Sequence, residues 1–224
     1  MYARYIKRFL DAVLSFFAIL LLSPLLLVLT LLGAVLLKGN PFFTQIRPGR
    51  GERLFRMLKF RSMTNACDGD GRLLPDDLRL TRYGRFIRGK SLDELPELWN
   101  ILIGEMSFVG PRPQLVRDMM FMTDKQRTRH TVRPGLTGLA QVSGRNALRW
   151  EVKLRLDVQY VQRVRFCEDF RILLRTARLL LCGGDGGNVT ELAEDYGDYL
   201  LHTGKISTEE YEQGRHDAKT LLGV

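Results

Sequence analysis

Hydrophobic residues are concentrated in one block near the amino end of the chain. Phe9 to Leu37 is 29 residues long and contains a single charged residue, Asp11. A block of this length is typical of a segment that enters a membrane. A secretory signal peptide would have a shorter apolar region and a cleavage site of small residues, and neither is present. We therefore expect residues 1–38 to form a membrane-inserted unit.

The pair Ser23-Pro24 lies in the middle of this block. Proline cannot donate a hydrogen bond to the carbonyl of Leu20, and its ring crowds that turn, so a helix should bend there. The Ser23 hydroxyl can satisfy part of the freed backbone in lipid. Each half of the block would form a helix of about 21 Å. That length is short of the hydrocarbon core of a bilayer, which is about 30 Å thick.

Basic residues flank the block on both sides, and such residues favour the cytoplasmic side of a membrane. They are Arg4, Lys7 and Arg8 before it, and Lys38, Arg47 and Arg50 after it. A re-entrant helix–break–helix hairpin, which enters and leaves by the same face, agrees with both the lengths and the charges. A kinked spanning helix remains the alternative, because spanning helices tolerate proline.

After Lys38 the pattern becomes that of a small mixed cytosolic domain, which we place at residues 39–182. Phe55 to Met63 predicts a short strand. Apolar residues recur at helical spacing after Leu95 and again from Lys153 to Leu181. The predicted fold class is therefore α+β, with a membrane hairpin attached to this small mixed domain.

The second helical segment carries a basic stripe beside apolar residues. The stripe consists of Arg171, Arg175 and Arg178. Such an amphipathic helix commonly lies at a membrane surface. A helix packed on a soluble core, with its basic face in solvent, fits the same pattern, so both interpretations stay open.

Charge is segregated along the chain. The 34 Lys and Arg residues exceed the 25 Asp and Glu residues, which gives a net charge of +9. Residues 183–224 form an acidic extension that contributes −6 from Asp185 onward, so residues 1–184 carry +15. The extension has helical patterns near Glu191–Leu201 and Thr208–Leu222. The basic body indicates an anionic partner such as a phosphorylated substrate or lipid headgroups. Its basic residues alternate with turns, which argues against nucleic acid.

Asp93-Glu94 is the leading candidate for chemistry. A carboxylate among arginines can bind Mg²⁺ or attack a phosphorus centre, because an acyl phosphate is reactive enough to pass its group on. Ser91-x-x-Glu94 is also a capping-box signature, in which Ser91 caps a helix and Glu94 bonds back to it. We expect both roles to be compatible, since free backbone N–H groups at a helix start favour anions.

Cations near this pair in the sequence can neutralise phosphate charge. The candidates are Lys59, Arg61, Arg85, Arg88, Arg112 and Arg145. Arg112 stands between Pro111 and Pro113, which restrict the backbone on both sides and so preset the direction of the guanidinium. Turns that contain glycine, such as Gly135-Leu136-Thr137-Gly138, offer backbone N–H groups as a weaker phosphate-binding signal. The three scattered cysteines predict neither a disulfide framework nor a Cys-rich zinc site.

Taken in order, several segments closely resemble the bacterial sugar transferase family, the monotopic polyprenyl-phosphate phosphoglycosyl transferases. They are KFRSM (59–63), GRFIR (84–88), SLDELPELWN (91–100), GEMSFVGPRP (104–113) and RPGLTGLAQVSGRN (133–146). The resemblance runs from about Tyr5 to Leu181. It implies that the Ser23-Pro24 segment is re-entrant and that residues 39–182 are the catalytic domain. Leu139, where an aromatic residue is common, and the extension from Gly183 onward depart from the family pattern.

The resemblance also implies a reaction. Asp93 would attack the sugar-linked phosphate of a UDP-sugar with Mg²⁺ as cofactor, UMP would leave, and undecaprenyl phosphate would then take the phosphosugar. Asp93 would also contact the metal, Glu94 would assist the metal site or proton handling, and Arg112 would hold phosphate. Lys59, Arg61 and Arg88 are the further phosphate-binding candidates, and Arg145 is placed for the nucleotide-sugar. This would be the first membrane step of surface-glycan or glycoprotein assembly, at the cytoplasmic face of the bacterial inner membrane.

Two other classes of function fit parts of the pattern. One is a kinked single-pass anchor that carries a different enzyme, such as a nucleotide-sugar hydrolase, which would not depend on a lipid acceptor. The other is a non-catalytic membrane-associated binding module, which would be indifferent to Asp93→Asn. The sugar, the glycan pathway, the role of the extension and the oligomeric state, whether homodimer or assembly with downstream glycosyltransferases, are open at this level.

Overall fold

The computed structural model describes residues 1–144, 147–182 and 194–223. The strands are β1 (Phe42–Pro48), β2 (Leu54–Phe60), β3 (Ser107–Val109) and β4 (Gly135–Thr137). The helices are α1 (Lys7–Leu36), α2 (Asp76–Arg79), α3 (Arg82–Gly89), α4 (Glu97–Ile103), α5 (Val116–Met120), α6 (Asp124–Arg127), α7 (Leu139–Val142), α8 (Trp150–Gln162), α9 (Phe166–Leu181), α10 (Tyr196–His202) and α11 (Thr208–Leu222). A π-helical turn at Tyr2–Ile6 leads into α1, and 3-10 turns lie at Arg50–Glu52, Leu92–Glu94 and Thr128–Thr131.

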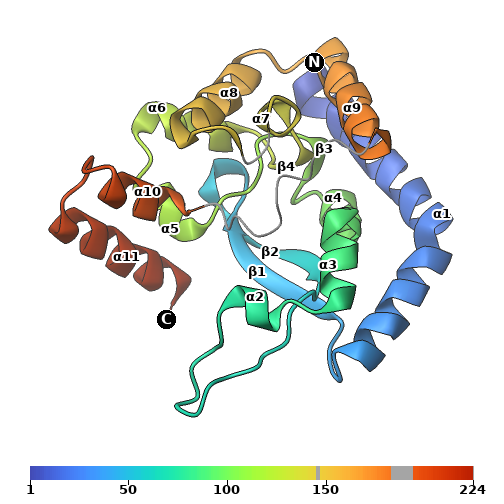
Figure 1. Ribbon diagram of the computed structural model, residues 1–224. Coiled ribbons are helices and arrows are strands. Elements are labelled where there is room, and N and C mark those ends of the chain that lie inside the picture. The colour runs from blue at the N-terminus through green and yellow to red at the C-terminus, as the bar shows by residue number, and fades with distance from the viewer. Residues whose placement is uncertain (145–146, 183–193, 224) are drawn as a thin grey trace.

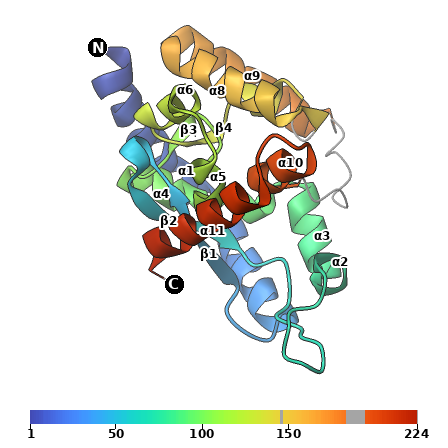
Figure 2. The ribbon, with the colours of Figure 1, turned by 90° about the vertical axis from the view of Figure 1, so that its left-hand side faces the viewer.

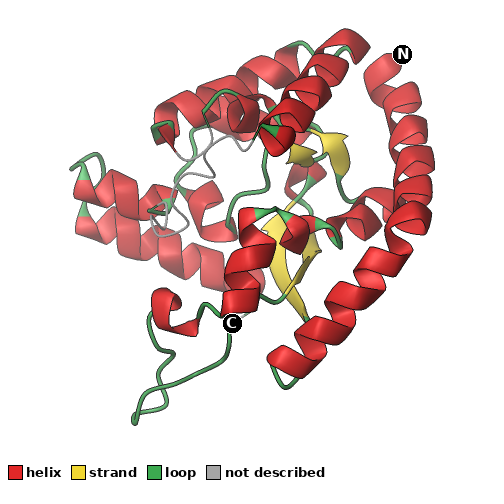
Figure 3. Ribbon diagram, turned by 45° about the vertical axis from the view of Figure 1, so that its right-hand side comes forward, coloured by secondary structure: helices red, strands yellow, loops and turns green. Residues whose placement is uncertain are grey.

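Two small sheets lie at the centre of the molecule, and helices surround them (Figure 1 and Figure 3). Strands β1 and β2 form an antiparallel hairpin in which Phe42 is opposite Phe60. Strands β3 and β4 are parallel, with Ser107 opposite Gly135. This mixture of helix and sheet confirms the α+β prediction, and the strand predicted at 55–63 is β2.

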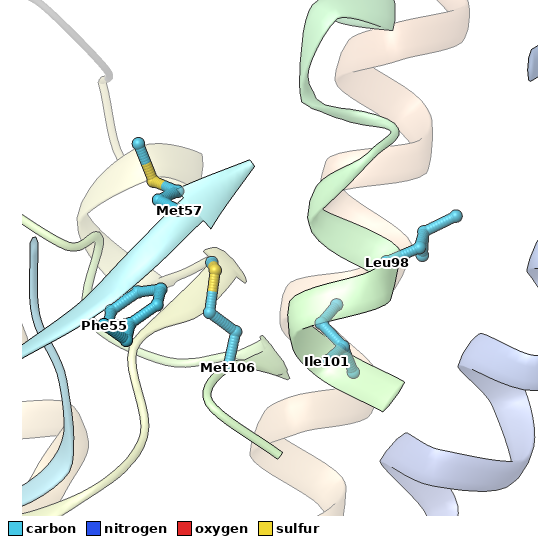
Figure 4. Close-up of a cluster of buried hydrophobic side chains, with 5 residues drawn as sticks. All are labelled: Phe55, Met57, Leu98, Ile101 and Met106. Atoms are coloured by element: carbon cyan, nitrogen blue, oxygen red, sulfur yellow. The ribbon is translucent and has the colours of Figure 1, made fainter. Parts of the chain in front are cut away.

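The hairpin packs on α4 through an apolar cluster (Figure 4). Phe55 and Met57 share a face of β2 because side chains two positions apart on a strand point the same way. Ile101 of α4 and Met106 lie toward the strand, whereas Leu98 extends from the other side of α4 (Figure 4). Ile101 and Met106 have no exposed surface. Residues from the first half of α1 pack against the same cluster, which joins the long helix to the body.

Asn100 closes the edge of β2 that β1 does not cover. Its Oδ1 accepts from the amide of Leu58 at 3.0 Å, and its Nδ2 donates to the carbonyl of Arg56 at 2.8 Å. An unpaired buried strand edge would leave backbone groups without partners. The Asn100 side chain therefore holds α4 in register with β2, and the turn that precedes α4 is placed beside the end of this strand.

Helix α1 continues through Pro24 and bends near its middle (Figure 1). The Ser23 hydroxyl donates to the carbonyl of Leu20 at 2.8 Å, which is the acceptor that Pro24 cannot serve. The predicted proline effect is thus a bend in a continuous helix rather than a break between two helices. By length and composition, Tyr2–Leu36 is long and apolar enough to cross a membrane.

Both ends of α1 are fastened to the same body. Near its start, Arg8 donates to the carbonyls of Ile101 and Leu102, each at 2.7 Å. Near its end, the Tyr83 hydroxyl donates to the carbonyl of Leu29 at 2.9 Å. Large apolar side chains are exposed between these attachments. They include Phe16, Phe17, Leu20, Leu21, Leu25, Leu27 and Val28.

The helical stretch predicted at 153–181 is two helices, α8 and α9, and α9 lies against the start of α1 (Figure 1). Buried Asp169 of α9 accepts from the Tyr2 hydroxyl at 2.6 Å and from Lys7 at 2.5 Å. Phe166, Phe170 and Leu174 are exposed on α9, and the ring of Phe166 packs edge-on against Tyr2 at a centroid distance of 5.9 Å. An exposed apolar strip with arginines beside it agrees with the interfacial interpretation of this helix.

The glycines around β3 and β4 allow two backbones to pass each other closely. The amide of Gly110 donates to the carbonyl of Thr137 at 2.9 Å, and the amide of Gly135 donates to the carbonyl of Pro111 at 3.0 Å. A Cβ at Gly135 would lie 2.1 Å from the nitrogen of Gly110. The phosphate-binding interpretation of this turn is therefore wrong for Gly135, because its amide is used within the sheet.

We expect Gly135→Ala to destabilise the protein by about 3 kcal/mol or more, because neither backbone can move away from the added methyl group. The thermal unfolding midpoint of purified protein in detergent measures this loss. Gly69→Ala is the matched control, since nothing lies within 4 Å of its Cβ position. Equal midpoints for the two variants would contradict the close approach of the backbones at β3 and β4.

Candidate active site

A single cleft of about 1080 Å³ brings together most of the residues singled out from the sequence. Its walls come from β1 and β2, the segment after β2, α3, the turn before α4, the segment after β3, and α8. The predicted site residues in its lining are Lys59, Arg61, Arg88, Asp93, Glu94 and Arg112. Arg85 does not line it, and Arg145 lies outside the described residues.

Asp93 and Glu94 lie on a tight turn before α4, not in its first turn. Ser91 adopts the left-handed conformation, with φ 53° and ψ 23°, and makes no side-chain cap. The predicted capping box is therefore wrong, and the Glu94 side chain points elsewhere. A serine in this conformation costs on the order of 1 kcal/mol or more. The local sequence does not favour this turn, so the surrounding contacts must hold it.

Glu94 is held between two cations from different parts of the chain. Its Oε1 accepts from Lys59 of β2 at 2.9 Å and from Arg112, after β3, at 2.7 Å. Burial by itself raises the pKa of Glu94, but the charges of Arg112 and Lys59 outweigh it and lower the pKa to about 2. Glu94 in turn raises the pKa of Arg112. The side chain of Arg112 remains 45% exposed, so its other donors are accessible to a ligand.

Asp93 is the other carboxylate of this turn. Among the described residues, no hydrogen bond or ion pair is made to its side chain, although it lines the cleft. Burial raises the pKa of Asp93, as does the neighbouring charge of Glu94, while Lys59, Arg88 and Arg112 oppose the shift. A raised pKa makes the ionised form a stronger nucleophile, and the three cations keep the charged form accessible.

Glu97 is a third carboxylate at the site, which the sequence reasoning missed. It is 3% exposed and lies 3.1 Å from Lys59. Burial raises its pKa, and Glu94 adds to the effect against the attraction of Lys59, so that the pKa reaches about 7. Glu94 and Glu97 both contact Lys59, but only Glu94 of these two also pairs with Arg112. Glu97 is therefore the member of the pair that takes up a proton first.

Three further arginines, from other segments of the chain, line the cleft and have buried Nε atoms. Within the described residues, the Nε atoms of Arg47, Arg61 and Arg79 have no hydrogen-bond partner. Burial lowers the pKa of Arg47 to about 10, and the nearby charge of Arg112 adds to the effect. Unsatisfied buried donors are costly, and a phosphate would satisfy them. Arg88 instead donates its Nε to the Ser62 hydroxyl at 2.8 Å.

The main chain at Arg112 is held by a buried ion pair that the sequence did not reveal. Arg129 donates to the carbonyl of Arg112 at 2.5 Å and to Asp157 of α8 at 2.8 Å. Both members of the pair are almost fully buried, at 1% and 4% side-chain exposure. Breaking such a pair leaves an uncompensated charge in the interior. The predicted restriction by the flanking prolines is therefore reinforced from a distant helix.

The residues present fit a magnesium ion that is held partly by its substrate. Within the described chain, no three His, Cys, Asp or Glu side chains are placed to hold a metal. Mg²⁺ commonly takes only one or two carboxylates and completes its sphere with water and substrate phosphates. Among the described residues, the Asp93 carboxylate oxygens have no partner and could make such a contact, whereas Glu94 is paired with Lys59 and Arg112.

The family model of bacterial sugar transferases matches residues 2–183. The chain belongs to this family. It is 47% identical to the uncharacterized sugar transferase EpsL of Bacillus subtilis, over 79% of this chain and 87% of the relative. It is 35% identical to a UDP-glucose:undecaprenyl-phosphate glucose-1-phosphate transferase of Klebsiella pneumoniae, and 37% identical to an undecaprenyl-phosphate galactose phosphotransferase of Salmonella typhimurium. These alignments cover 76% and 80% of this chain but only 39% and 41% of the two longer proteins.

The raised pKa of Glu97 predicts how stability depends on pH. Between the usual value of 4.5 and about 7, the folded protein binds more protons at this site than the unfolded chain does. The contribution of Glu97 is therefore complete below pH 4.5 and is lost as the pH rises through about 7. We expect Glu97→Gln to flatten the fall in unfolding free energy across this window, measured by chemical denaturation in detergent. Glu212→Gln, on an exposed position of α11, is the control, and parallel curves for Glu97→Gln and the wild type would contradict the assignment.

Proposed function

We propose that the protein transfers a phosphosugar from a UDP-sugar to undecaprenyl phosphate through a covalent intermediate on Asp93. The main support for the proposal is that Asp93 and Glu94 differ in their contacts. Glu94 is held by two cations, while the carboxylate of Asp93 has no partner among the described residues and lines a cleft rich in guanidinium groups. An unpaired carboxylate beside phosphate-binding groups is the arrangement that nucleophilic phosphoryl transfer needs.

The names of the relatives support the two substrates. The Klebsiella relative is named for UDP-glucose and undecaprenyl phosphate, and a relative from Aeromonas hydrophila for UDP-N-acetylgalactosamine and the same lipid phosphate. The sugars differ while the lipid carrier is shared. We infer that this chain uses undecaprenyl phosphate as well, and that its sugar is one of the uridine diphosphate sugars.

The reaction follows from the placement of the charges. An Asp93 oxygen attacks the phosphorus that bears the sugar, the bond from this phosphorus to the bridging oxygen breaks, and UMP leaves with the electron pair. A phosphate oxygen of the lipid then attacks the same phosphorus, and the Asp93 carboxylate leaves. Arg112, Arg61 and Arg88 hold the phosphate oxygens in both steps. Mg²⁺, bound beside Asp93, would supply further positive charge on the diphosphate.

Glu94 acts in this scheme as an anchor for cations. Its pKa of about 2 keeps it ionised at neutral pH, so it is a poor proton acceptor. Its charge holds Arg112 and Lys59 at fixed positions beside Asp93. The metal-assisting or proton-handling role expected from the sequence is therefore replaced, in this proposal, by an electrostatic one.

The same proposal places the enzyme at the cytoplasmic face of the bacterial inner membrane, with α1 re-entrant and the protein monotopic. Both ends of α1 are fastened to one body, and the apolar surface lies at the bend between them. A spanning arrangement would put these two attachments on opposite sides of the bilayer. The exposed apolar strip of α9 lies beside the start of α1 and would rest at the interface.

We expect purified protein in nanodiscs to release UMP from at least one UDP-sugar only when Mg²⁺ and undecaprenyl phosphate are both present. Asp93→Asn should lower the rate by more than about a thousandfold, because the nucleophile is lost. Asp77→Asn is the control, since this exposed carboxylate does not line the cleft. Sustained release without the lipid would indicate a hydrolase, and an active Asp93→Asn protein would exclude the covalent mechanism.

Topology is tested by labelling with a membrane-impermeant maleimide. In a background where Cys67, Cys167 and Cys182 are replaced by serine, single cysteines at Ala3 and Gly39 should both react from the cytoplasmic side. A cysteine at Leu21, which is 80% exposed in the structure, should be protected by lipid. Labelling of the Ala3 and Gly39 positions from opposite sides would establish a spanning helix instead.

A further inference from the structure

The acidic C-terminal extension packs on the side of the body away from α1 (Figure 1), and Figure 2 shows α10 and α11 in front of α5. Its described part, residues 194–223, lies beyond the segment that the family model matches. Helix α11 begins with a capping box, in which Ser207 accepts from Glu210. The sequence pattern at 208–222 is confirmed, and α10 is the described part of the pattern near 191–201.

The extension packs closely around one aromatic ring of the body. The ring of Phe121, just after α5, lies between Gly197 of α10 and Gly214 of α11. A Cβ at either glycine would come within 2.5 Å of this ring. Tyr211 stacks on the same ring with a centroid distance of 6.0 Å. Close-packed contacts of this kind do not tolerate an added methyl group, so a single substitution can separate the extension from the body.

The extension also completes the hydrogen bonding of a buried carboxylate. Asp118 of α5 is 1% exposed. Its Oδ1 accepts from the amide of Tyr196 in the extension at 2.9 Å, and its Oδ2 accepts from the amide of Leu115 at 3.2 Å. Removing the Tyr196 donor would leave a buried carboxylate oxygen without its partner, which is costly. The Asp118 carboxylate therefore connects the amide of Tyr196 in the extension to the amide of Leu115 at the start of α5.

Leu115 ends the short segment that begins at Arg112 and lines the cleft. A second connection reaches the same segment through α8. Trp150 of α8 donates its Nε1 to the carbonyl of Glu194 at 2.9 Å, and Asp157 of the same helix holds Arg129 against the carbonyl of Arg112. Both ends of the segment 112–115 are thus supported by elements on which the extension packs.

We propose that residues 194–223 act as a clamp that positions Arg112, with Asp118 as the positioning residue that connects α10 to the cleft. The catalytic consequence rests on the proposed function, whereas the mechanical connection does not. When the extension is docked, the segment 112–115 is fixed and the Arg112 guanidinium is held beside Glu94. When it is undocked, Leu115 loses its fixed acceptor and Arg112 loses its alignment toward the phosphate.

The test uses the full-length chain in nanodiscs with Gly214→Ala, which should undock the extension. Glu212→Ala, at an exposed position of the same helix, is the matched control. Phe121→Leu removes the ring atoms nearest to Gly214, so the double variant Phe121→Leu/Gly214→Ala should dock again. Tyr211→Leu is a milder variant that keeps the test usable if Gly214→Ala does not fold.

Hydrogen exchange of the Leu115 amide is the first measurement, and it needs no turnover. We expect Gly214→Ala to accelerate exchange at both Tyr196 and Leu115, and the double variant to restore protection. Fast exchange at Tyr196 with unchanged protection at Leu115 would overturn the clamp. If the wild type releases no UMP from any UDP-sugar, the proposed function fails, and this measurement alone decides the clamp.

The kcat/KM for UMP release is the second measurement. Gly214→Ala should lower it about tenfold, because a displacement of the order of 1 Å at a positioning group has effects of this size or larger. In an Arg112→Lys background, Gly214→Ala should produce no further loss, since the group to be positioned is already altered. A loss of equal size in both backgrounds would show that the extension acts on general stability and not through Arg112.

Discussion

The site depends on the contact of Glu94 with Lys59 and Arg112. It joins the hairpin, the turn before α4 and the segment after β3, which are far apart in the chain, at distances of 2.9 and 2.7 Å. A partly buried charge cluster of this kind is retained only where its geometry compensates for lost hydration. The arrangement uses Glu94 to hold the cations, and it leaves Asp93 without a partner among the described residues. The neighbouring turn, with Ser91 in a left-handed conformation, is held in place by the same contacts.

A second feature of the structure is the apolar surface that α1 exposes. Helix α1 bends while both of its ends remain attached to the body. The Ser23 hydroxyl donates to the carbonyl that Pro24 cannot serve, so the bend leaves this backbone group with a partner. Asp169 ties α9 to the first turn of the long helix, which places an apolar strip of α9 beside it. Under the proposed function, this arrangement would let a water-soluble nucleotide-sugar and a lipid phosphate approach one cleft from different phases.

Close packing at the glycines and at the extension stabilises the region around the site. Gly110 and Gly135 let the backbones at β3 and β4 approach so closely that no methyl group fits between them. Phe121 between Gly197 and Gly214 makes a similarly close contact at the outer face. Because close-packed interiors move as units, a shift at this outer face can reach the segment that carries Arg112. The buried Arg129–Asp157 pair supports that segment from the opposite end.

The sequence alone determined the features that depend on local pattern and short motifs: the apolar block, the bend at Pro24, the strand now seen as β2, the helix at 208–222, the family, and the candidates Asp93, Glu94, Lys59, Arg61, Arg88 and Arg112. It could not determine which carboxylate is paired, because that depends on Lys59 and Arg112 approaching from distant segments. The capping box failed because long-range charges outweigh a local cap worth about 1 kcal/mol. Glu97, Arg129 and Asp118 were not recognised because their roles depend on burial, which only the tertiary structure creates. Burial raises the pKa of Glu97 and requires that Arg129 be paired with Asp157. The buried Asp118 accepts a hydrogen bond from Tyr196 of the extension, which lies far away in the sequence.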